Sequence, residues 1–500
     1  MSERLRPADL AFLAMESART PMHNATLEIF EPSSEGFDYA KLLAMIADRI
    51  AFVPRYRQRL RTVPGRLANP VWVDDDDFDL TYHVRRSALP RPGTMDQLRE
   101  LVARIMSRRL DRDRPLWEVY LVEGLEGGRF AILSKSHQIL VDGVSTVDLG
   151  QVLLDVDPRP REVVHDHWRP AKEPSPPALL AEAVNETLRH PSTLGDTVRG
   201  NAESLWRVAG SLTGAAASSA AALSNRRHTP ETPLHAQLSE QRRFVTVRTG
   251  LQDYRAVRRV HGGTVNDVVM ATIAGAMRAW LMTRAEPVHG SRSLRAMVPM
   301  SVIDHELEPT SLGSQVTGHL VSLPIGESSP VVRLHQVSYA FKAHKDTGMA
   351  VAADRLADVA GFAPTTFHAL GSRVAAAQSR RGFDLAVTNV PGPQFPLYAA
   401  GAQMLESYPV QPLLPGHALS IGVTSYDGGV FFGINADRDA LPDVDVLGQC
   451  LEEALAELVD SASDARPRAP RGRKASSTSR PRPTRKGGKQ SGTPTKGGRS

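Results

Sequence analysis

The segment Ser136–Gly143 (SHQILVDG) carries the residues of this chain best suited to chemistry. It follows an apolar run that predicts a strand, and it brings His137, Asp142 and Gly143 to the exit of that strand. A histidine can act as a general base, a nearby carboxylate can fix the loop, and a glycine permits a sharp turn. A single His–Asp pair is more often structural than catalytic, so the segment alone leaves both interpretations open.

The elements around this segment predict a mixed α/β N-terminal region, residues 1–172. Apolar residues recur at helical spacing in Tyr39–Phe52 and Met95–Leu110. Strands are predicted at Pro70–Val73 and Phe78–Val84. Trp117–Val122 and Phe130–Leu133 then form a hairpin around the GLEGG turn, and its second strand runs into the His137 segment.

The remaining chain divides by composition. Residues 173–241 are rich in Ala, Ser, Thr and Pro and predict a partly helical interdomain linker, with helices at Glu182–Arg189 and Ser204–Leu223. Residues 242–462 are strongly patterned again and predict a second α/β domain. Its helices are Thr264–Leu281, with Thr264 or Asn266 near its start, and Val444–Val459. Its strands are expected at 242–251, 294–301, 319–325, 383–390, 419–426 and 428–436.

Charge is distributed very unevenly along the chain. Residues 465–500 contain 12 Lys and Arg and no Asp or Glu, which gives this segment a charge of +12. Because the whole chain has a net charge of +5, the other residues together carry −7. Residues 463–500 therefore predict a disordered basic tail, and the basic pI does not indicate a nucleic-acid-binding globule. The single cysteine, Cys450, excludes an intramolecular disulfide and a cysteine-based zinc site. With no signal peptide or spanning segment evident, a cytoplasmic protein is expected.

Several ordered blocks give the chain a family resemblance over roughly residues 5–460. SHQILVDG, with Pro115–Glu118 (PLWE) upstream, resembles the HHxxxDG signature of the bacterial wax ester synthase/acyl-CoA:diacylglycerol acyltransferase family, part of the CoA-dependent acyltransferase superfamily. Further similar blocks are MESARTPMH (15–23), WVDDDDFDLTYHVRR (72–86), VNDVV (265–269), MVPMSV (297–302), TNVPGP (388–393) and GVFFGINADRD (429–439).

One position departs from the family signature. The family's general base is the second His of HHxxxDG, and here that position is Gln138, so only His137 remains. A glutamine amide is not a usable base near neutral pH. Because neighbouring residues leaving a strand point to opposite sides, His137 need not reach the place of the missing base. We expect Gln138 to face the substrate channel and His137 to point elsewhere.

The resemblance also implies roles for other positions. Asp142 and Gly143 match the signature, with Asp142 expected to hold its loop through a buried ion pair with an arginine. Pro115, Leu116 and Trp117 match the PLW motif, although the hydrophobic core is the favoured place for Trp117. Asn266 and Asp267 match the ND motif and also suit a helix N-terminus. Channel or structural positions are further implied at Asn389, Pro391 and Gly392, the last shaping a tight turn.

The activity that the resemblance implies is acyl transfer from acyl-CoA to a diacylglycerol or a long-chain alcohol, without metal or redox cofactor. The implied architecture is two acyltransferase-like α/β domains around a central channel. The alternative from another functional class is a non-catalytic paralogue that binds acyl-CoA or neutral lipid at membranes or lipid droplets. In both cases the basic tail predicts peripheral contact with an anionic membrane face or a lipid droplet, and no specific nucleic-acid partner.

Overall fold

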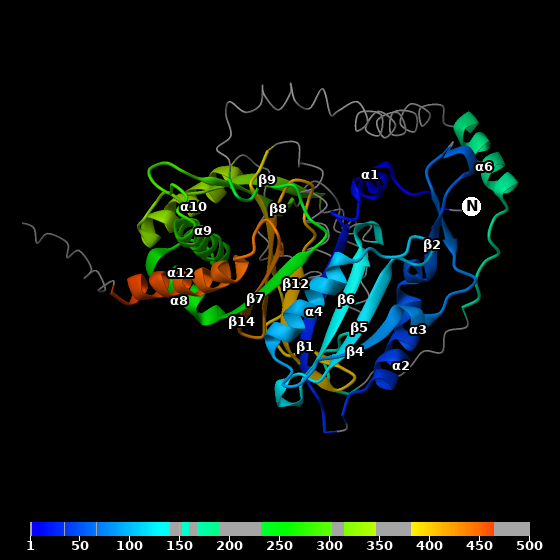
Figure 1. Ribbon diagram of the computed structural model, residues 1–500, viewed down its shortest axis with the longest axis horizontal. Helices are drawn as coiled ribbons and strands as arrows, with labels where there is room; N and C mark the ends of the chain where they lie inside the picture. Colours follow the sequence, from blue (N-terminus) through cyan, green and yellow to red (C-terminus); the bar gives the residue numbers. More distant parts are fainter. Residues whose placement is uncertain are drawn as a thin grey trace, which may run out of the picture.

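Two six-stranded sheets, each accompanied by helices, organise the described part of the chain (Figure 1). The computed structural model describes residues 3–34, 36–66, 68–140, 150, 153–159, 168–189, 232–302, 315–346 and 382–464. Each sheet has its own apolar core. The predicted mixed α/β fold with two domains is confirmed.

The first sheet has the strand order β11-β12-β1-β6-β5-β4. Its strands are β1 (His23–Glu31), β4 (Val84–Ala88), β5 (Trp117–Glu123), β6 (Phe130–His137), β11 (Tyr398–Ala399) and β12 (Ala402–Val410). The associated helices are α1 (Pro7–Met15), α2 (Tyr39–Arg49), α3 (Leu80–His83) and α4 (Met95–Ser107), and β2 (Gln58–Arg61) pairs with β3 (Val71–Asp74). Every residue of β6 is buried, including the polar second half Ser134–His137.

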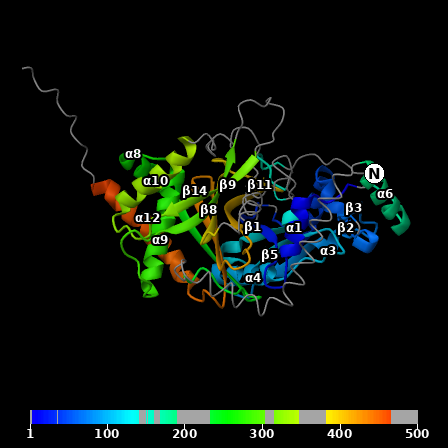
Figure 2. The ribbon, with the colours of Figure 1, turned by 90° about the horizontal axis from the view of Figure 1, so that it is seen from above.

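The second sheet has the strand order β7-β14-β13-β10-β8-β9. Its strands are β7 (Arg242–Gly250), β8 (Leu294–Val302), β9 (Gln315–Leu323), β10 (Leu385–Pro391), β13 (Leu419–Tyr426) and β14 (Gly429–Asp437). The helices α8 (Leu251–His261), α9 (Val265–Thr283), α10 (Pro330–Asp346) and α12 (Val444–Asp464) lie together beside this sheet, on the side away from the first one (Figures 1 and 2). Thr264 caps α9 and makes a reciprocal capping box with Asp267, as the predicted helix start requires.

The two sheets are connected by β11 and β12, which come from the C-terminal half and complete the N-terminal sheet. β12 pairs antiparallel with β1, with Ala25 opposite Val410. The predicted domains, residues 1–172 and 242–462, give no indication that strands of the second region join the sheet of the first. β12 also packs on the second sheet, where Pro409 lies on the cross-strand pair Gly422 and Gly433. A Cβ at Gly433 would stand 1.8 Å from the Pro409 carbonyl oxygen, so the glycine permits this close approach.

Some of the expected elements differ from the structure or lie outside the described residues. The strand predicted over Phe78–Val84 is wrong: Leu80–His83 forms the short helix α3, because the Asp79 side chain accepts from the Thr81 backbone N–H and caps the turn. The helix expected at Glu182–Arg189 begins earlier, since α6 spans Pro176–Arg189. The helix expected at Ser204–Leu223 lies outside the described residues, as does most of the basic tail.

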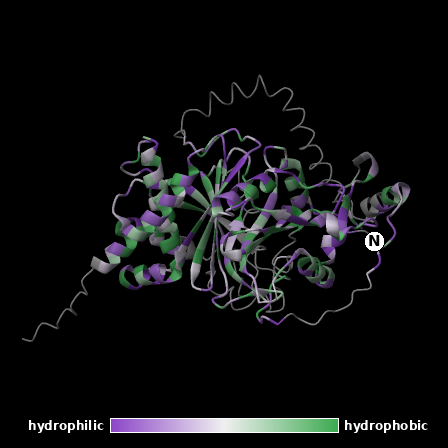
Figure 3. Cartoon of the chain, turned by 60° about the horizontal axis from the view of Figure 1, so that its bottom comes forward, coloured by the Kyte–Doolittle hydropathy of each residue, from purple (hydrophilic) through white to green (hydrophobic). Residues whose placement is uncertain are grey.

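Hydrophobic residues follow the strands and the inner faces of the helices (Figure 3). Cys450 is buried in α12, as a structural thiol would be. None of the described helices combines the length and apolar composition that crossing a bilayer requires.

Candidate active site

The HQxxxDG segment leaves β6 beside the start of β5 and the start of β1. His137 is the last residue of β6 and lies opposite His23 of β1. Its backbone N–H donates to the Leu116 carbonyl, which joins the PLW motif to the segment. Gln138 then begins a short 3₁₀ turn that ends at Leu140. Asp142 and Gly143 lie outside the described residues, so the expected ion pair of Asp142 stays a prediction.

His137 is completely buried, and both of its ring nitrogens have neighbours. Nδ1 accepts a hydrogen bond from the Ile139 backbone N–H at 3.2 Å. Nε2 lies 3.6 Å from Oε1 of Glu16, a residue that follows α1. The ring also lies edge-on to His23, with 5.6 Å between centroids. Since Nδ1 accepts, the ring proton belongs on Nε2, where it faces the Glu16 carboxylate.

Gln138 contacts a different part of β1. Its side chain is 1% exposed, and Nε2 donates to Oδ1 of Asn24 at 3.0 Å, while its backbone N–H donates to the Met22 carbonyl. His23 and Asn24 are neighbours on one strand, so their side chains project to opposite faces. His137 and Gln138 therefore project to opposite faces of the sheet, as strand alternation predicts.

Glu16 and His23 were not singled out by the sequence reasoning, although both lie in the MESARTPMH block. Glu16 Oε1 is 3.1 Å from His23 Nε2, and its Oε2 accepts from Arg112 Nε at 2.9 Å. Burial raises the pKa of Glu16, but hydrogen bonds from His137 and His23 outweigh burial and hold it well below its usual range. Burial and the charge of Lys135 lower the pKa of His23 to about 3.

The ligand atoms of Glu16, His23 and His137 lie within 4.8 Å of one another, a spacing that could hold a metal ion. The surroundings favour a hydrogen-bonded network instead. Arg112 already neutralises the carboxylate, and the buried Lys135 adds a second positive charge nearby. A divalent cation would be repelled by both side chains. The network is suited to holding the His137 ring in one tautomer and one orientation.

The PLW residues belong to the core beneath the segment. Pro115 and Leu116 are buried, and Trp117 is 1% exposed. The Trp117 indole N–H donates to the Tyr56 carbonyl at 2.7 Å, and its ring stacks on His83 with 4.6 Å between centroids. Trp117 thus supports the strand that carries the segment.

The motif residues of the second domain are brought together at the start of α9 and the end of β10. Asn389 Nδ2 donates to Oδ1 of Asn266 at 2.9 Å. Asp267 is buried and its Oδ2 accepts from the Thr264 backbone N–H and from Ser338 Oγ. Pro391 ends β10, and the Gly392 N–H donates to Ser425 Oγ at 3.3 Å. Asn266 and Asn389 therefore form one polar pair, while Asp267 acts in the helix cap.

Solved structures support the fold first. The chain resembles the first condensation domain of the CDA synthetase, with a TM-score of 0.52 and 15% sequence identity. The match covers 93% of this chain and 97% of that domain, which indicates a shared fold. It is more similar to the wax ester synthase/diacylglycerol acyltransferase from Marinobacter aquaeolei VT8, with a TM-score of 0.63 and 28% identity over 92% of this chain and all of that one. The fold and the motif together define an acyltransferase.

The particular family follows from the sequence comparisons. The family model of the wax ester synthase/diacylglycerol acyltransferase catalytic domain matches residues 5–269, and that of the WS/DGAT C-terminal domain matches residues 312–459. The chain belongs to this family. Among its relatives in Mycobacterium tuberculosis strain H37Rv, the probable diacylglycerol O-acyltransferase tgs1 is 34% identical over 87% of this chain and 90% of its own length. Probable tgs2 is 32% identical over 91% of this chain and 98% of its own length. Probable tgs3 is 43% identical over 52% of this chain and 96% of its own length.

Proposed function

We propose that this acyltransferase moves a fatty acyl group from acyl-CoA to the hydroxyl of a diacylglycerol, giving triacylglycerol, and that long-chain alcohols are a second acceptor. The names of the mycobacterial relatives support the first acceptor, and that of the Marinobacter enzyme supports both. The alcohol oxygen attacks the thioester carbonyl, the C–S bond breaks, and coenzyme A leaves. The hydroxyl proton passes to the departing thiolate as the new C–O bond forms, so coenzyme A leaves as the free thiol.

The observation that carries the mechanistic part of the proposal is the pair His137–Gln138. Gln138 occupies the position of the family's base and bonds to Asn24, and an amide cannot accept the hydroxyl proton. The His137 ring is held between Glu16 and the Ile139 N–H on the other face of the sheet. We therefore propose turnover that relies on substrate positioning and polar stabilisation of the oxyanion, without a histidine base and without metal or redox cofactor.

The test is acyl transfer from labelled acyl-CoA to a diacylglycerol and to a long-chain alcohol, by the wild type and by Gln138→His. General base catalysis contributes roughly 10²–10⁴-fold, so we expect the variant to gain turnover of that order. Gln138→Ala is the matched control, because it breaks the Asn24 hydrogen bond without supplying a base. A gain in both variants would mean that the amide blocks the site, and the base argument would be wrong.

The second candidate function is binding of acyl-CoA or neutral lipid without catalysis, and the same residue, Gln138, favours it. This candidate predicts no transfer by the wild type or by Gln138→His, together with measurable binding of an acyl-CoA. Restored turnover in Gln138→His alone would instead indicate a site that is complete except for its base.

We further propose that the basic tail attaches the protein to an anionic membrane or lipid-droplet surface. Residues 465–500 carry +12, and each Lys or Arg near such a surface contributes about 1 kcal/mol. Sedimentation with anionic vesicles should show salt-dependent binding of the full chain and weaker binding of a 1–464 truncation. Equal binding of the two chains would place the membrane contact on the folded domains. Binding of the tail to nucleic acid but not to vesicles would contradict the membrane proposal.

A further inference from the structure

The face of the first sheet that carries Gln138, here called the Gln138 face, is lined by buried polar side chains near that residue. Side chains alternate between the two faces of a strand, and directly opposed residues of paired strands share a face. Asn24 of β1 lies opposite Ser136 of β6, and Thr26 lies opposite Ser134. These four residues are between 1% and 6% exposed. A buried polar lining of this kind indicates a surface that serves hydrogen bonding more than packing.

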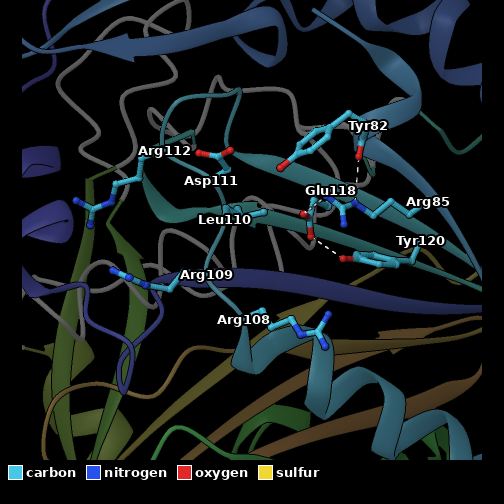
Figure 4. A pocket seen from close by; sticks show the side chains of 9 residues that line it. All are labelled: Tyr82, Arg85, Arg108, Arg109, Leu110, Asp111, Arg112, Glu118 and Tyr120. Atoms are coloured by element: carbon cyan, nitrogen blue, oxygen red, sulfur yellow. Dashed lines mark hydrogen bonds and ion pairs between the residues drawn. The ribbon is translucent and has the colours of Figure 1, made fainter.

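The other face of the same sheet is separate from this lining. It carries His137 and Lys135, and Glu118 of β5 lies opposite Lys135. A cavity of about 540 Å³ opens on that side, lined by Glu118, Tyr120 and the arginines that follow α4 (Figure 4). There the Tyr120 hydroxyl donates to Glu118 Oε2 at 2.7 Å. Since Gln138 stands at the position of the family's base, groups that act directly in the proposed reaction come from the Gln138 face.

Asn24 is the residue of the Gln138 face that contacts Gln138 itself. Its Oδ1 accepts from Gln138 Nε2 at 3.0 Å, so the carbonyl end of the Asn24 amide is occupied. Its Nδ2 is buried and has no hydrogen-bond partner among the described residues. An unpaired buried donor reduces stability, so its retention points to a partner that the folded chain itself does not supply.

The hydrogen bond from Gln138 makes the other end of the Asn24 amide a better donor. Accepting at the carbonyl oxygen polarises the amide, and hydrogen bonds in a chain strengthen one another. The bond also fixes the amide in space, because the Gln138 backbone N–H donates to the Met22 carbonyl and β1 lies between β6 and β12. A donor held in this way is preorganised, as the stabilisation of developing charge requires.

We propose that Asn24 is a catalytic residue, whose Nδ2 donates a hydrogen bond to the carbonyl oxygen of the acyl thioester. This inference rests on the proposed function. When the alcohol oxygen bonds to the carbonyl carbon, an electron pair moves onto the carbonyl oxygen, and the Asn24 N–H stabilises the resulting charge. The electron pair then returns, the C–S bond breaks, and coenzyme A leaves as the thiol with the proton of the alcohol. Asn24 thereby supplies the polar stabilisation on which a site with Gln138 in place of a base depends.

The first measurement is acyl transfer by the wild type, Asn24→Leu and Asn24→Ser. Removal of one oxyanion donor costs about 10²–10³-fold in kcat, so we expect Asn24→Leu to lose that factor with an unchanged KM for acyl-CoA. Asn24→Ser keeps a hydroxyl donor and should recover part of the loss. Ser407→Ala is the matched control, because Ser407 is a buried hydroxyl of the same face, opposite Glu28, and should leave kcat unchanged. A wild-type kcat in Asn24→Leu overturns the proposal.

The second measurement needs no turnover and compares two unreactive analogues by calorimetry. One is the ketone analogue of palmitoyl-CoA, in which a methylene group replaces the thioester sulfur and the carbonyl is kept. The other is S-hexadecyl-CoA, a thioether without a carbonyl. We expect the wild type to bind the ketone about tenfold more tightly, the effect of one hydrogen bond, and Asn24→Leu to bind the two analogues equally.

The binding result tests the proposal independently of turnover. A preference for the ketone that Asn24→Leu abolishes supports it, even if the wild type transfers no acyl group, so the proposed function can fail separately. Equal binding of the two analogues by the wild type, binding of neither, or a preference that persists in Asn24→Leu overturns it. Loss of kcat in Asn24→Leu with the preference intact would make Asn24 a structural partner of Gln138 and overturn the catalytic assignment.

Discussion

Two buried histidines should make the protein sensitive to mild acid. His83 is completely buried, its Nδ1 bonds to the Trp117 carbonyl at 2.8 Å, and its Nε2 has no hydrogen-bond partner among the described residues. His417 stacks on Phe383 at 4.2 Å, and its Nδ1 likewise has none within that part of the chain. Burial lowers the pKa of His83 and of His417 to about 4.

The sign of the pH effect follows from proton counting. Both histidines take up a proton near pH 6.5 in the unfolded chain but only near pH 4 in the folded protein. Between these values the unfolded chain binds more protons, so stability is fully present above pH 6.5 and falls as the pH decreases towards 4. At about pH 5, which is 1.5 units below the unfolded pKa, each histidine removes about 2 kcal/mol and the pair about 4 kcal/mol. That is a large part of a typical free energy of unfolding, about 5–15 kcal/mol.

The measurement is urea unfolding at about pH 7 and about pH 5, where the difference in unfolding free energy contains the contributions of His83 and His417 together with that of His23, whose pKa is also lowered by burial. His83→Gln and His417→Gln should each reduce this difference by about 2 kcal/mol, whatever they do to stability at neutral pH. The exposed His289 provides the control, and His289→Gln should leave the difference unchanged. A wild type equally stable at both pH values, or variants with an undiminished difference, would refute the reasoning.

Two further predictions concern packing. Gly433→Ala places a methyl group 1.8 Å from the Pro409 oxygen, so the two sheets must separate locally, and urea unfolding should show a loss of about 1–3 kcal/mol; an unchanged stability would show that β12 is not held tightly there. Trp117→Phe removes the indole donor to the buried Tyr56 carbonyl and should cost about 1–3 kcal/mol in the same measurement. The matched variant Trp72→Phe measures the cost of the smaller ring alone, because Trp72 is also buried and contacts Arg55 through its ring face; the loss in Trp117→Phe should exceed it if the hydrogen bond matters.

Regular local patterns made much of the fold predictable. The strand Leu419–Tyr426 has the expected boundaries and the helix capped by Thr264 begins where expected, because alternation and capping are local signals. α3 was missed because a capping aspartate, Asp79, outweighs the β-like composition of its neighbours. Strand alternation also anticipated that His137 and Gln138 project to opposite faces.

The rest of the site depends on contacts between distant parts of the chain. Glu16 reaches His137 across 121 positions (137 minus 16), and no spacing rule connects a residue after a helix with the end of a strand so far away. The arginines after α4 were equally invisible as the lining of a cavity, since a basic loop in sequence is usually a solvated one. Only the fold shows that Arg85 and Glu118 line the same cavity as the arginines that follow α4.

The pairing of β1 with β12 has a consequence for how the chain folds during synthesis. Ala25 and its partner Val410 are separated by 385 positions (410 minus 25), so β1 leaves the ribosome long before the strand that covers its edge. Contacts of such long range form slowly, and an uncovered edge of a buried strand is a template for pairing with other chains. The N-terminal half should therefore depend on chaperones, or on slow translation, until residue 410 has emerged. A fragment that ends before β12 should aggregate when expressed alone and become soluble when the missing strand is supplied on a second chain.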